Sequence, residues 1–193
     1  MTSVAVLLSA GGGTRFHGAT HKLLADLHGR PVWRQALDHV LEAGFDQVIV
    51  VTGAVELPVP EGMRPDAVSW VHNPDWAAGQ ASSLHVAVRA ADALGAASVT
   101  VGLADQPFVT TASWTAVRTA DPGCRIVVAE YDGRPGPHPV RLGREVWPHL
   151  TTSGDEGARS LLRLHPEWVC HVPCVGSIAD IDTLEDLERW KSC

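Results

Sequence analysis

Short apolar runs alternate with longer segments of helical periodicity along the first half of the chain. The longer segments, Val32–Ala43 and Ala81–Leu94, have apolar residues at the spacing of helices that pack on a core. The short runs are rich in β-branched residues and end near turns, which predicts strands at Ser3–Ser9, Gln47–Thr52, Ala67–Val71 and Ser98–Leu103. Repeated strand–helix units favour a largely parallel sheet with helices on both faces.

The ends of the two predicted helices are marked in the sequence. Gly44 is placed to end the first helix, and Ser82 and Ser83 are suited to capping the start of the second. One stripe of the second helix is expected to be buried, and it consists of Leu84, Val88, Ala91 and Leu94.

The pattern changes in the second half of the chain. Arg125–Tyr131 and His138–Leu142 resemble strands, and the turn-rich Asp132–Pro137 between them predicts a hairpin. Two short helices, a strand and a closing helix follow at Arg144–Leu150, Glu156–Leu164, Trp168–Pro173 and Leu184–Lys191. We expect a Rossmann-like α/β fold, a three-layer α/β/α sandwich with a mostly parallel sheet and an antiparallel excursion, in one domain over residues 1–193.

Composition narrows the class of function. The 193 residues are 45% apolar and carry a formal net charge of −7, which argues against nucleic acid and anionic membranes as partners. No apolar run approaches the roughly 20 residues of a membrane span, and the N-terminal residues lack a signal-peptide pattern. We therefore expect a cytoplasmic protein.

The four cysteines and ten histidines do not match a known metal-binding pattern. Closed zinc sites usually combine two closely spaced pairs of ligands, whereas here only two cysteines are close together in the sequence. We expect most histidines to lie on the surface or in loops. Reduced structural thiols are expected at Cys124, Cys170, Cys174 and Cys193.

A glycine-rich segment, Gly11–Gly13, follows the first predicted strand. Glycines can bring backbone N–H groups close to a ligand, and Arg15 and Lys22 supply positive charge beside them. The segment is not a P-loop, because Ala19 stands where the lysine would be, and not a dinucleotide fingerprint, because Phe16 replaces its third glycine. The pattern favours a polyphosphate cradle over a simple strand-to-helix turn.

Carboxylates are expected at the same edge of the sheet. Asp105 follows the predicted strand Ser98–Leu103, so it should lie beside the glycine-rich segment. Asp180 and Asp182 are two residues apart in an extended segment, so both face one side. Carboxylates beside a triphosphate suit Mg²⁺, although Asp105 could instead shape a turn, and Asp182 or Thr183 could cap the last helix.

Five ordered blocks run through the chain. They are Leu8–Arg15 with Lys22 and Gly29–Val32; Asn73–Trp76 with Gly79 and Ser82–Leu84; Asp105–Pro107; Gly154–Arg159; and Asp180–Thr183 with Glu185–Leu187. Together they resemble the MobA-like NTP transferases, and most of all the molybdenum cofactor cytidylyltransferases, over essentially the whole chain. The departures from that pattern are Ser9, an extra residue at His17, Gln80 and Leu184. The resemblance implies the fold of the nucleotide-diphospho-sugar transferases.

The resemblance also implies nucleotidyl transfer, in which a phosphate of the acceptor attacks the α-phosphorus of an NTP and pyrophosphate leaves. It implies catalytic roles for Arg15 on the β- and γ-phosphates, Lys22 towards the α-phosphate and Asp105 on Mg²⁺. Asp180 and Asp182 are the candidates for the second metal ligand, with Asp180 preferred. An attacking phosphate is already ionised, so no general base is needed.

Further residues are assigned to the two substrates. The nucleotide-binding set is Ala10, Gly11, Gly12, Gly13, Thr14, Asn73, Gly79, Ser82 and Ser83. The acceptor-binding set is His138, Asp155 and Arg159. Trp76 is expected either beside the site or in the core, and Arg159 either on the acceptor's phosphate or in a surface ion pair.

The blocks are most similar to the cytidylyl branch, which predicts CTP as the donor and a molybdopterin-type cofactor as the acceptor. The alternatives are guanylyl transfer to the same cofactor, transfer to a sugar phosphate, and a nucleotide-binding protein without turnover. We expect a monomer or weak dimer that can make transient contact with a molybdoenzyme or chaperone, and no nucleic-acid or membrane partner.

Overall fold

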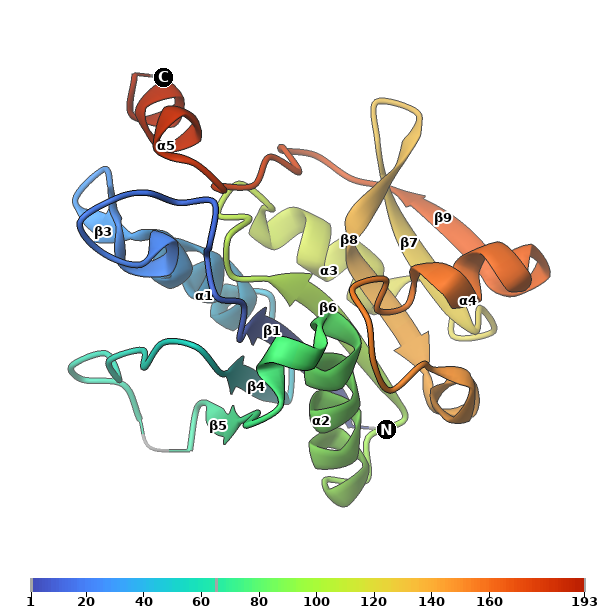
Figure 1. Cartoon of the computed structure of the whole chain (residues 1–193). Helices are drawn as coiled ribbons and strands as arrows, with labels where there is room; N and C mark the ends of the chain where they lie inside the picture. The colour runs from blue at the N-terminus through green and yellow to red at the C-terminus, as the bar shows by residue number, and fades with distance from the viewer. Residues whose placement is uncertain (1, 65, 193) are drawn as a thin grey trace.

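A seven-stranded sheet forms the centre of the computed structural model, which describes residues 2–64 and 66–192 (Figure 1). Its strands lie in the order β5-β4-β1-β6-β8-β7-β9. Among these seven strands only β8 runs antiparallel to its neighbours, which confirms the predicted sheet. The strands are β1 (Ser3–Ser9), β4 (Gln47–Thr52), β5 (Ser69–His72), β6 (Ser98–Leu103), β7 (Ile126–Tyr131), β8 (Arg134–Gly143) and β9 (Val169–Pro173).

Helices cover both faces of this sheet and complete a three-layer sandwich (Figure 1). α2 and α4 pack on one face, and α1 and α3 pack on the other. No helix in the described part of the chain is both long and apolar enough to cross a bilayer. The helices are α1 (Val32–Glu42), α2 (Gln80–Ala93), α3 (Thr111–Thr119), α4 (Arg159–Leu164) and α5 (Leu184–Lys191), with 3₁₀ turns η1 (Lys22–Leu24), η2 (Trp76–Ala78), η3 (Arg144–His149) and η4 (Pro166–Trp168).

The apolar runs of the sequence are strands buried on both sides. In β1, Val4 and Val6 pack in the core beneath α2, whereas Ala5 and Leu7 pack in the core beneath α1. Successive strand side chains point to opposite faces, so a strand covered on both faces is apolar at every position. The first predicted helix ends as expected, because Gly44 follows it with φ +73°.

Two expectations for the second helix were wrong. Ser82 and Ser83 do not cap α2 but lie inside it, and Gly79 occupies the N-cap position with φ +102°. The helix also ends at Ala93, one residue before Leu94, which is 42% exposed instead of buried. Because the chain turns away there, the last position of the predicted stripe leaves the core.

The predicted hairpin is confirmed, but its turn is shorter. The turn is Asp132-Gly133, and both residues have positive φ, at 50° and 74°. Two such residues form the tight turn whose twist matches that of paired strands, so β8 already begins at Arg134. In Figure 1 the turn of the hairpin extends above β8 and β7, and β9 is the edge strand beside them.

The expectation of reduced cysteines was wrong for one pair. Cys124 and Cys170 form a disulfide across 46 residues of sequence, whereas Cys174 is free. Cys124 precedes β7 and Cys170 lies in β9, so the parallel pairing of those strands brings the two thiols together. Spacing along the sequence does not reveal such a contact. Cys193 lies outside the described residues.

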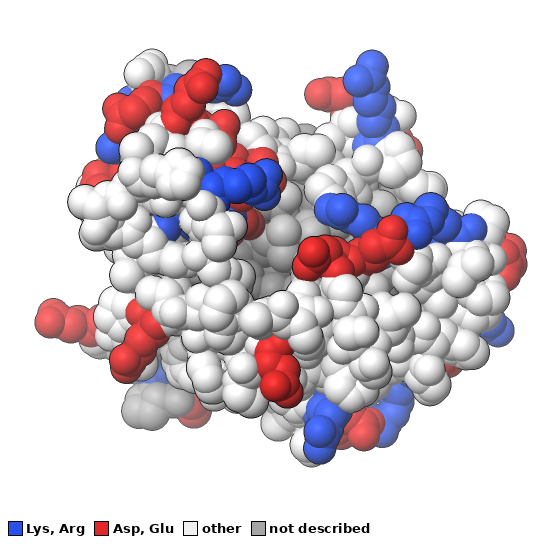
Figure 2. All heavy atoms as spheres, in the orientation of Figure 1, with Lys and Arg blue, Asp and Glu red and all other residues white. Residues whose placement is uncertain are grey.

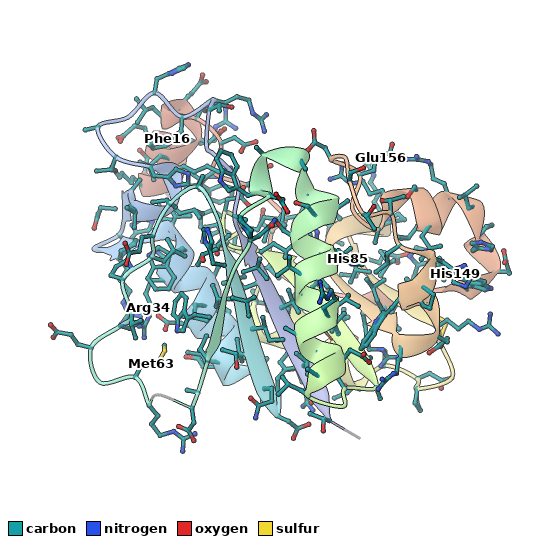
Figure 3. All side chains as sticks on the ribbon, turned by 60° about the horizontal axis from the view of Figure 1, so that its bottom comes forward. Phe16, Arg34, Met63, His85, His149 and Glu156 are labelled. Atoms are coloured by element: carbon teal, nitrogen blue, oxygen red, sulfur yellow. A yellow bond between two sulfur atoms is a disulfide. The ribbon has the colours of Figure 1, made fainter. Side chains whose placement is uncertain are left out.

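A smaller apolar cluster holds the loop after β1 against the end of the chain. Phe16 packs with Leu27 of the short ribbon β2 (Asp26–Leu27) and β3 (Arg30–Pro31), and with Ile181 and Leu187. Figure 3 shows Phe16 in this loop beside the C-terminal helix. The cluster brings residues 15–22 and 180–182 to the same place.

Candidate active site

The glycine-rich loop lies at the carboxyl end of β1 and is braced by His21. The backbone N–H of Leu23 donates to His21 Nδ1 (3.2 Å), so the ring proton is on Nε2, which donates to the carbonyl oxygen of Gly11 (3.1 Å). Burial lowers the pKa of His21 and favours this neutral form. Gly13 has φ +59°, and a Cβ there would lie 2.8 Å from Nε2, so only glycine fits.

Lys22 lies between two carboxylates at the floor of the site. Its Nζ is 2.5 Å from Asp105 Oδ2 and 2.6 Å from Asp182 Oδ1. Arg15 Nη2 is 2.6 Å from the other oxygen of Asp182. Burial lowers the pKa of Lys22, but the two carboxylates outweigh burial and raise the pKa above its usual value. The ammonium therefore stays charged.

One backbone and one side-chain hydrogen bond bring the segment around Asp182 to the end of β6. The N–H of Ile181 donates to the carbonyl oxygen of Asp105 (2.9 Å), and Gln106 Nε2 donates to that of Ile178 (3.3 Å). Thr183 then caps α5 in a capping box with Asp186, as one alternative reading of this segment expected.

The N-terminus of α2 forms the opposite side of the site. Gly79 lies against the loop that precedes α4, and a Cβ on it would be 2.5 Å from Gly154. The N–H of Gly154 donates to the carbonyl oxygen of Ala78, and the N–H of Ala81 donates to the carbonyl oxygen of Gly154, each at 2.9 Å. This contact places Asp155 beside the first turn of α2, where the helix dipole favours negative charge.

These elements enclose a cleft of about 460 Å³. Figure 2 shows the face hollowed at its centre, with acidic and basic side chains on both sides of the hollow. The cleft is lined by Leu8, Ser9, Ala10, Gly11, Gly12, Gly13, Thr14, Arg15, Lys22, Leu23, Trp76, Ala77, Gly79, Gln80, Ser83, Leu103, Asp105, Asp155 and Asp182.

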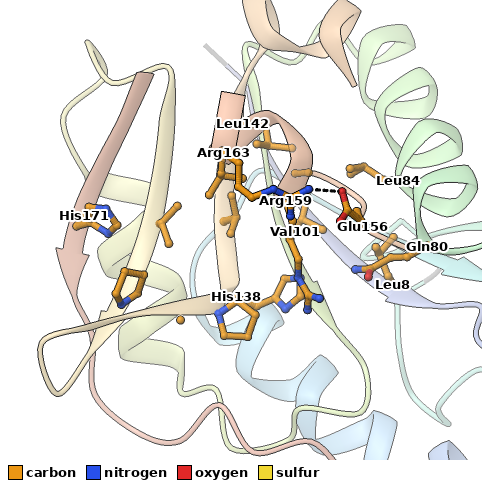
Figure 4. A pocket seen from close by; sticks show the side chains of 17 residues that line it. Leu8, Gln80, Leu84, Val101, His138, Leu142, Glu156, Arg159, Arg163 and His171 are labelled. Carbon is orange, nitrogen blue, oxygen red and sulfur yellow. Dashed lines mark hydrogen bonds and ion pairs between the residues drawn. The ribbon is translucent and has the colours of Figure 1, made fainter. Parts of the chain in front are cut away.

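A second cavity of about 320 Å³, which we call the chamber, adjoins the cleft at Leu8 and Gln80. Its polar side chains come mainly from around α4, where Arg163 Nη2 forms an ion pair with Glu156 at 2.6 Å (Figure 4). Arg159 extends from the same helix and makes no ion pair with any described residue. The apolar lining includes Leu84, Val101, Val128, Val140, Leu142 and Leu162.

His138 is the buried polar group of the chamber. Burial lowers its pKa to about 3, and the Arg159 guanidinium acts in the same direction. Nδ1 is buried without a hydrogen-bond partner among the described residues, although Tyr131 Oη donates to the backbone oxygen of His138 (3.1 Å). Figure 4 shows the imidazole and the Arg159 side chain close together at one end of the chamber. A ligand here would meet a neutral imidazole.

Comparison with known proteins supports what the cleft indicates. The model of the MobA-like NTP transferase domain matches residues 5–169. This chain belongs to that family. It is 30% identical to nicotine blue oxidoreductase of Paenarthrobacter nicotinovorans, over 95% of this chain and 94% of that protein.

Solved structures agree with the family assignment. Rv0371c of Mycobacterium tuberculosis is similar with a TM-score of 0.79 and 29% identity, over 100% of this chain and 98% of that one. A manganese complex of the same protein has a TM-score of 0.79 and 26% identity, over 100% and 99%. As a member of the MobA-like NTP transferases, the protein is a nucleotidyltransferase.

The carboxylates of this transferase suit a divalent metal ion. Asp105 Oδ1 is buried and has no hydrogen-bond partner among the described residues, and Asp182 lies across Lys22 from it. No three His, Cys, Asp or Glu side chains of residues 2–64 and 66–192 gather closely enough to hold a metal by themselves. Asp105 and Asp182 would therefore hold the ion together with water and phosphate oxygens, a donor set that suits Mg²⁺ and Mn²⁺.

The structure brings most of the predicted site residues together. The sequence preferred Asp180 as the second ligand, but it is Asp182 that pairs with Lys22 and lines the cleft. Burial, followed by the nearby Asp182, raises the pKa of Asp180. Trp76 was expected either beside the site or in the core, and it does both: its ring lies over Gly12 in the cleft and also packs on the core. The roles of all these residues stay predictions.

Asn73 and Ser82 lie just behind the cleft wall. Asn73 is 1% exposed, and its Nδ2 donates to Ser82 Oγ and Ser83 Oγ, both at 2.9 Å. Ser82 Oγ also lies within hydrogen-bond distance of the carbonyl oxygens of Asp75 and Gly79. Of the three polar side chains, only Ser83 lines the cleft. Asn73 therefore contacts Ser83 from behind the cleft wall, and Ser82 is bonded to Asn73 and to backbone oxygens.

Sequence reasoning missed His21 and the wall of the chamber. His21 itself belongs to none of the sequence blocks, although it precedes Lys22, so its bond to Gly11 is visible only in the fold. The chamber's apolar residues, such as Val128 and Leu142, belong to strands whose sequences resemble any buried strand. No periodicity separates a residue that lines a cavity from one that fills the core.

Proposed function

We propose that this protein transfers CMP from CTP to a phosphate of a molybdopterin-type acceptor, with Mg²⁺, and releases pyrophosphate. One observation carries the proposal: a polar cleft with a glycine-rich loop, two basic side chains and three carboxylates adjoins a mainly apolar chamber that contains Arg159. The first cavity suits a metal-bound triphosphate, and the second suits the body of a phosphate-bearing acceptor.

In this proposal the loop and the basic side chains orient the donor. The backbone of Gly11–Thr14 lies against the triphosphate, Arg15 binds the β- and γ-phosphates, and Lys22 moves towards the α-phosphate. The bound metal ion supplies neutralisation of phosphate charge. The acceptor phosphate needs no proton removed at neutral pH, so the task of the chain is in-line placement of the two phosphates.

The mainly apolar lining of the chamber bears on which chemical class of acceptor would bind there. A sugar ring carries hydroxyl groups on most of its carbons, and each would need a hydrogen-bond partner in a closed cavity. The chamber offers mainly Leu, Val and Pro side chains, and its polar side chains are Gln80, His138, Glu156, Arg159, Arg163 and His171. These features support an acceptor that packs ring faces on the apolar wall and places its phosphate on Arg159.

Selection of CTP is assigned to the start of α2. Ser83 and Gln80 offer a hydroxyl and an amide at the cleft, next to the ring of Trp76. Such groups can bind a pyrimidine edge and lose partners when the wrong base is present. GTP is the alternative donor. We further propose that the protein works in the cytoplasm as a monomer or weak dimer.

Pyrophosphate release tests the proposal directly. The protein is incubated with Mg²⁺, each of CTP, GTP, UTP and ATP, and either molybdopterin or a panel of sugar 1-phosphates. We expect release with CTP and molybdopterin, and a nucleotide–cofactor product by mass spectrometry. Release only with sugar phosphates contradicts the acceptor, and release only with GTP contradicts the donor. A redox activity such as the relative's name states, without pyrophosphate release, contradicts the proposal as a whole.

A further inference from the structure

The ammonium of Lys22 occupies the space between the two carboxylates that suit a metal ion. Nζ contacts Asp105 Oδ2 at 2.5 Å and Asp182 Oδ1 at 2.6 Å, and the lysine side chain is only 10% exposed. A divalent ion shared by these carboxylates would need the same oxygens at a shorter distance. The metal and the ammonium therefore compete for one position.

The remaining free oxygen does not remove this competition. Asp105 Oδ1 is buried and unpartnered among the described residues, so it is available to a metal ion. An ion on that oxygen would still share the Asp105 carboxylate with the Lys22 ammonium, and two cations so close together repel strongly where water is scarce. A free metal ion gains full access only when Lys22 leaves.

Arg15 provides a contrast on the same carboxylate. It contacts Asp182 Oδ2 at 2.6 Å, but its side chain is 75% exposed. An exposed ion pair contributes little, because water solvates both partners when they separate. The ion pairs of Lys22 are different, because its own side chain is mostly buried and the separated ammonium would need a new anion.

A triphosphate supplies that anion. The cleft that holds the glycine-rich loop also contains Lys22, and the lysine side chain has a flexible stem of four carbons. We propose that Lys22 acts as a built-in counter-cation, which keeps free divalent metal ions off Asp105 and Asp182 until a bound triphosphate takes its ammonium. The inference rests on the proposed function in one respect, namely that these two carboxylates are the metal ligands.

Manganese binding without nucleotide tests the inference. Bound and free Mn²⁺ are measured by electron paramagnetic resonance for the wild-type protein, Lys22→Met and Arg15→Met. We expect Lys22→Met to bind Mn²⁺ at least about tenfold more tightly than wild type, and Arg15→Met to change the affinity much less. Equal affinity in wild type and Lys22→Met would overturn the inference, and so would equal tightening in both variants.

A second measurement covers the case in which Lys22→Met folds poorly because the partly buried carboxylates of Asp105 and Asp182 lose their partner. Thermal unfolding is followed with and without Mn²⁺. Ions that bind the folded state raise the melting temperature, so Mn²⁺ should stabilise Lys22→Met more than wild type. Equal shifts contradict the inference. Neither measurement uses nucleotide or turnover, so it can succeed where the transfer assay fails. Absence of Mn²⁺ binding in every variant contradicts the metal assignment and the inference together.

Discussion

The cleft and the chamber share Leu8 and Gln80, but the pKa of the basic group in each is shifted in opposite directions. In the cleft, burial lowers the pKa of Lys22, yet Asp105 and Asp182 raise it beyond its usual value. In the chamber, burial lowers the pKa of His138 to about 3, and Arg159 adds to the effect. A buried basic group stays charged only where carboxylates compensate it.

Because of this difference, the two cavities would recognise their ligands by different kinds of interaction. In the cleft, fixed charges and backbone N–H groups act on phosphate, which is charged in every state of the reaction. In the chamber, a neutral imidazole and apolar walls act on shape and on uncharged hydrogen-bonding groups. Changes in the cleft should therefore affect the rate of transfer, whereas changes in the chamber should affect the binding of one substrate.

The largest effect is expected in the cleft. Asp105→Asn removes one negative charge with almost no change in volume, and we expect kcat to fall by roughly 10²- to 10³-fold. Pyrophosphate release measures the rate, and circular dichroism checks the fold. Asp66→Asn, whose side chain is 76% exposed, is the matched control and should keep wild-type activity. A near-normal rate for Asp105→Asn would remove Asp105 from the metal site.

The chamber can be filled without touching the cleft. Leu162 lines the chamber, and Leu164, two residues later, is 73% exposed. We expect Leu162→Trp to raise the KM of the acceptor on the order of 10- to 100-fold while the KM of CTP stays unchanged. Leu164→Trp should leave both values unchanged. If Leu162→Trp raises the KM of CTP instead, the chamber belongs to the donor.

The lowered pKa of His138 in the chamber should make the stability of the protein depend on pH. Its pKa is lowered from 6.5 to about 3 in the folded protein, so below pH 6.5 the unfolded chain binds a proton that the folded chain does not. The contribution of His138 to stability is present above pH 6.5 and is lost as the pH falls towards 3. Between pH 7 and pH 5 the free energy of unfolding should fall by about 2 kcal/mol from this group.

Urea unfolding at the two pH values measures this effect. His138→Gln cannot titrate, so its free energy of unfolding should depend less on pH by about that amount. His85, which is exposed on α2, gives the control His85→Gln with wild-type dependence. Equal pH dependence in wild type and His138→Gln would mean that the pKa of His138 is not lowered in the folded protein.

The smallest effect concerns the choice of base. Ser83 lines the cleft, whereas Ser82 lies behind it in hydrogen bonds to backbone carbonyls. We expect Ser83→Ala to narrow the CTP:GTP ratio in kcat/KM severalfold, and Ser82→Ala to cost stability by about 1 kcal/mol with a smaller change in the ratio. A competition assay with equal CTP and GTP measures the ratio. The opposite ranking would make Ser82 the group that reads the base.

Local pattern predicted the strands and helices because each is governed by neighbours in the sequence. The apolar run of β1 and the periodicity of α1 required no knowledge of distant residues, and neither did the glycine-rich loop between them. The observed boundary of an element differs from the predicted one where a contact with a distant residue intervenes. α4 begins at Arg159 instead of the predicted Glu156, because the preceding loop is held against Gly79 of α2.

The sequence by itself determined the fold class, the family resemblance and the group of residues at the cleft. Arg15, Lys22 and Asp105 follow the ends of β1 and β6, and adjacent parallel strands end at one edge of a sheet. Only the tertiary structure decided how these charges pair, that Asp182 instead of Asp180 contacts Lys22, and that Cys124 meets Cys170. These outcomes depend on contacts between residues that are at least 46 positions apart, which no local pattern encodes.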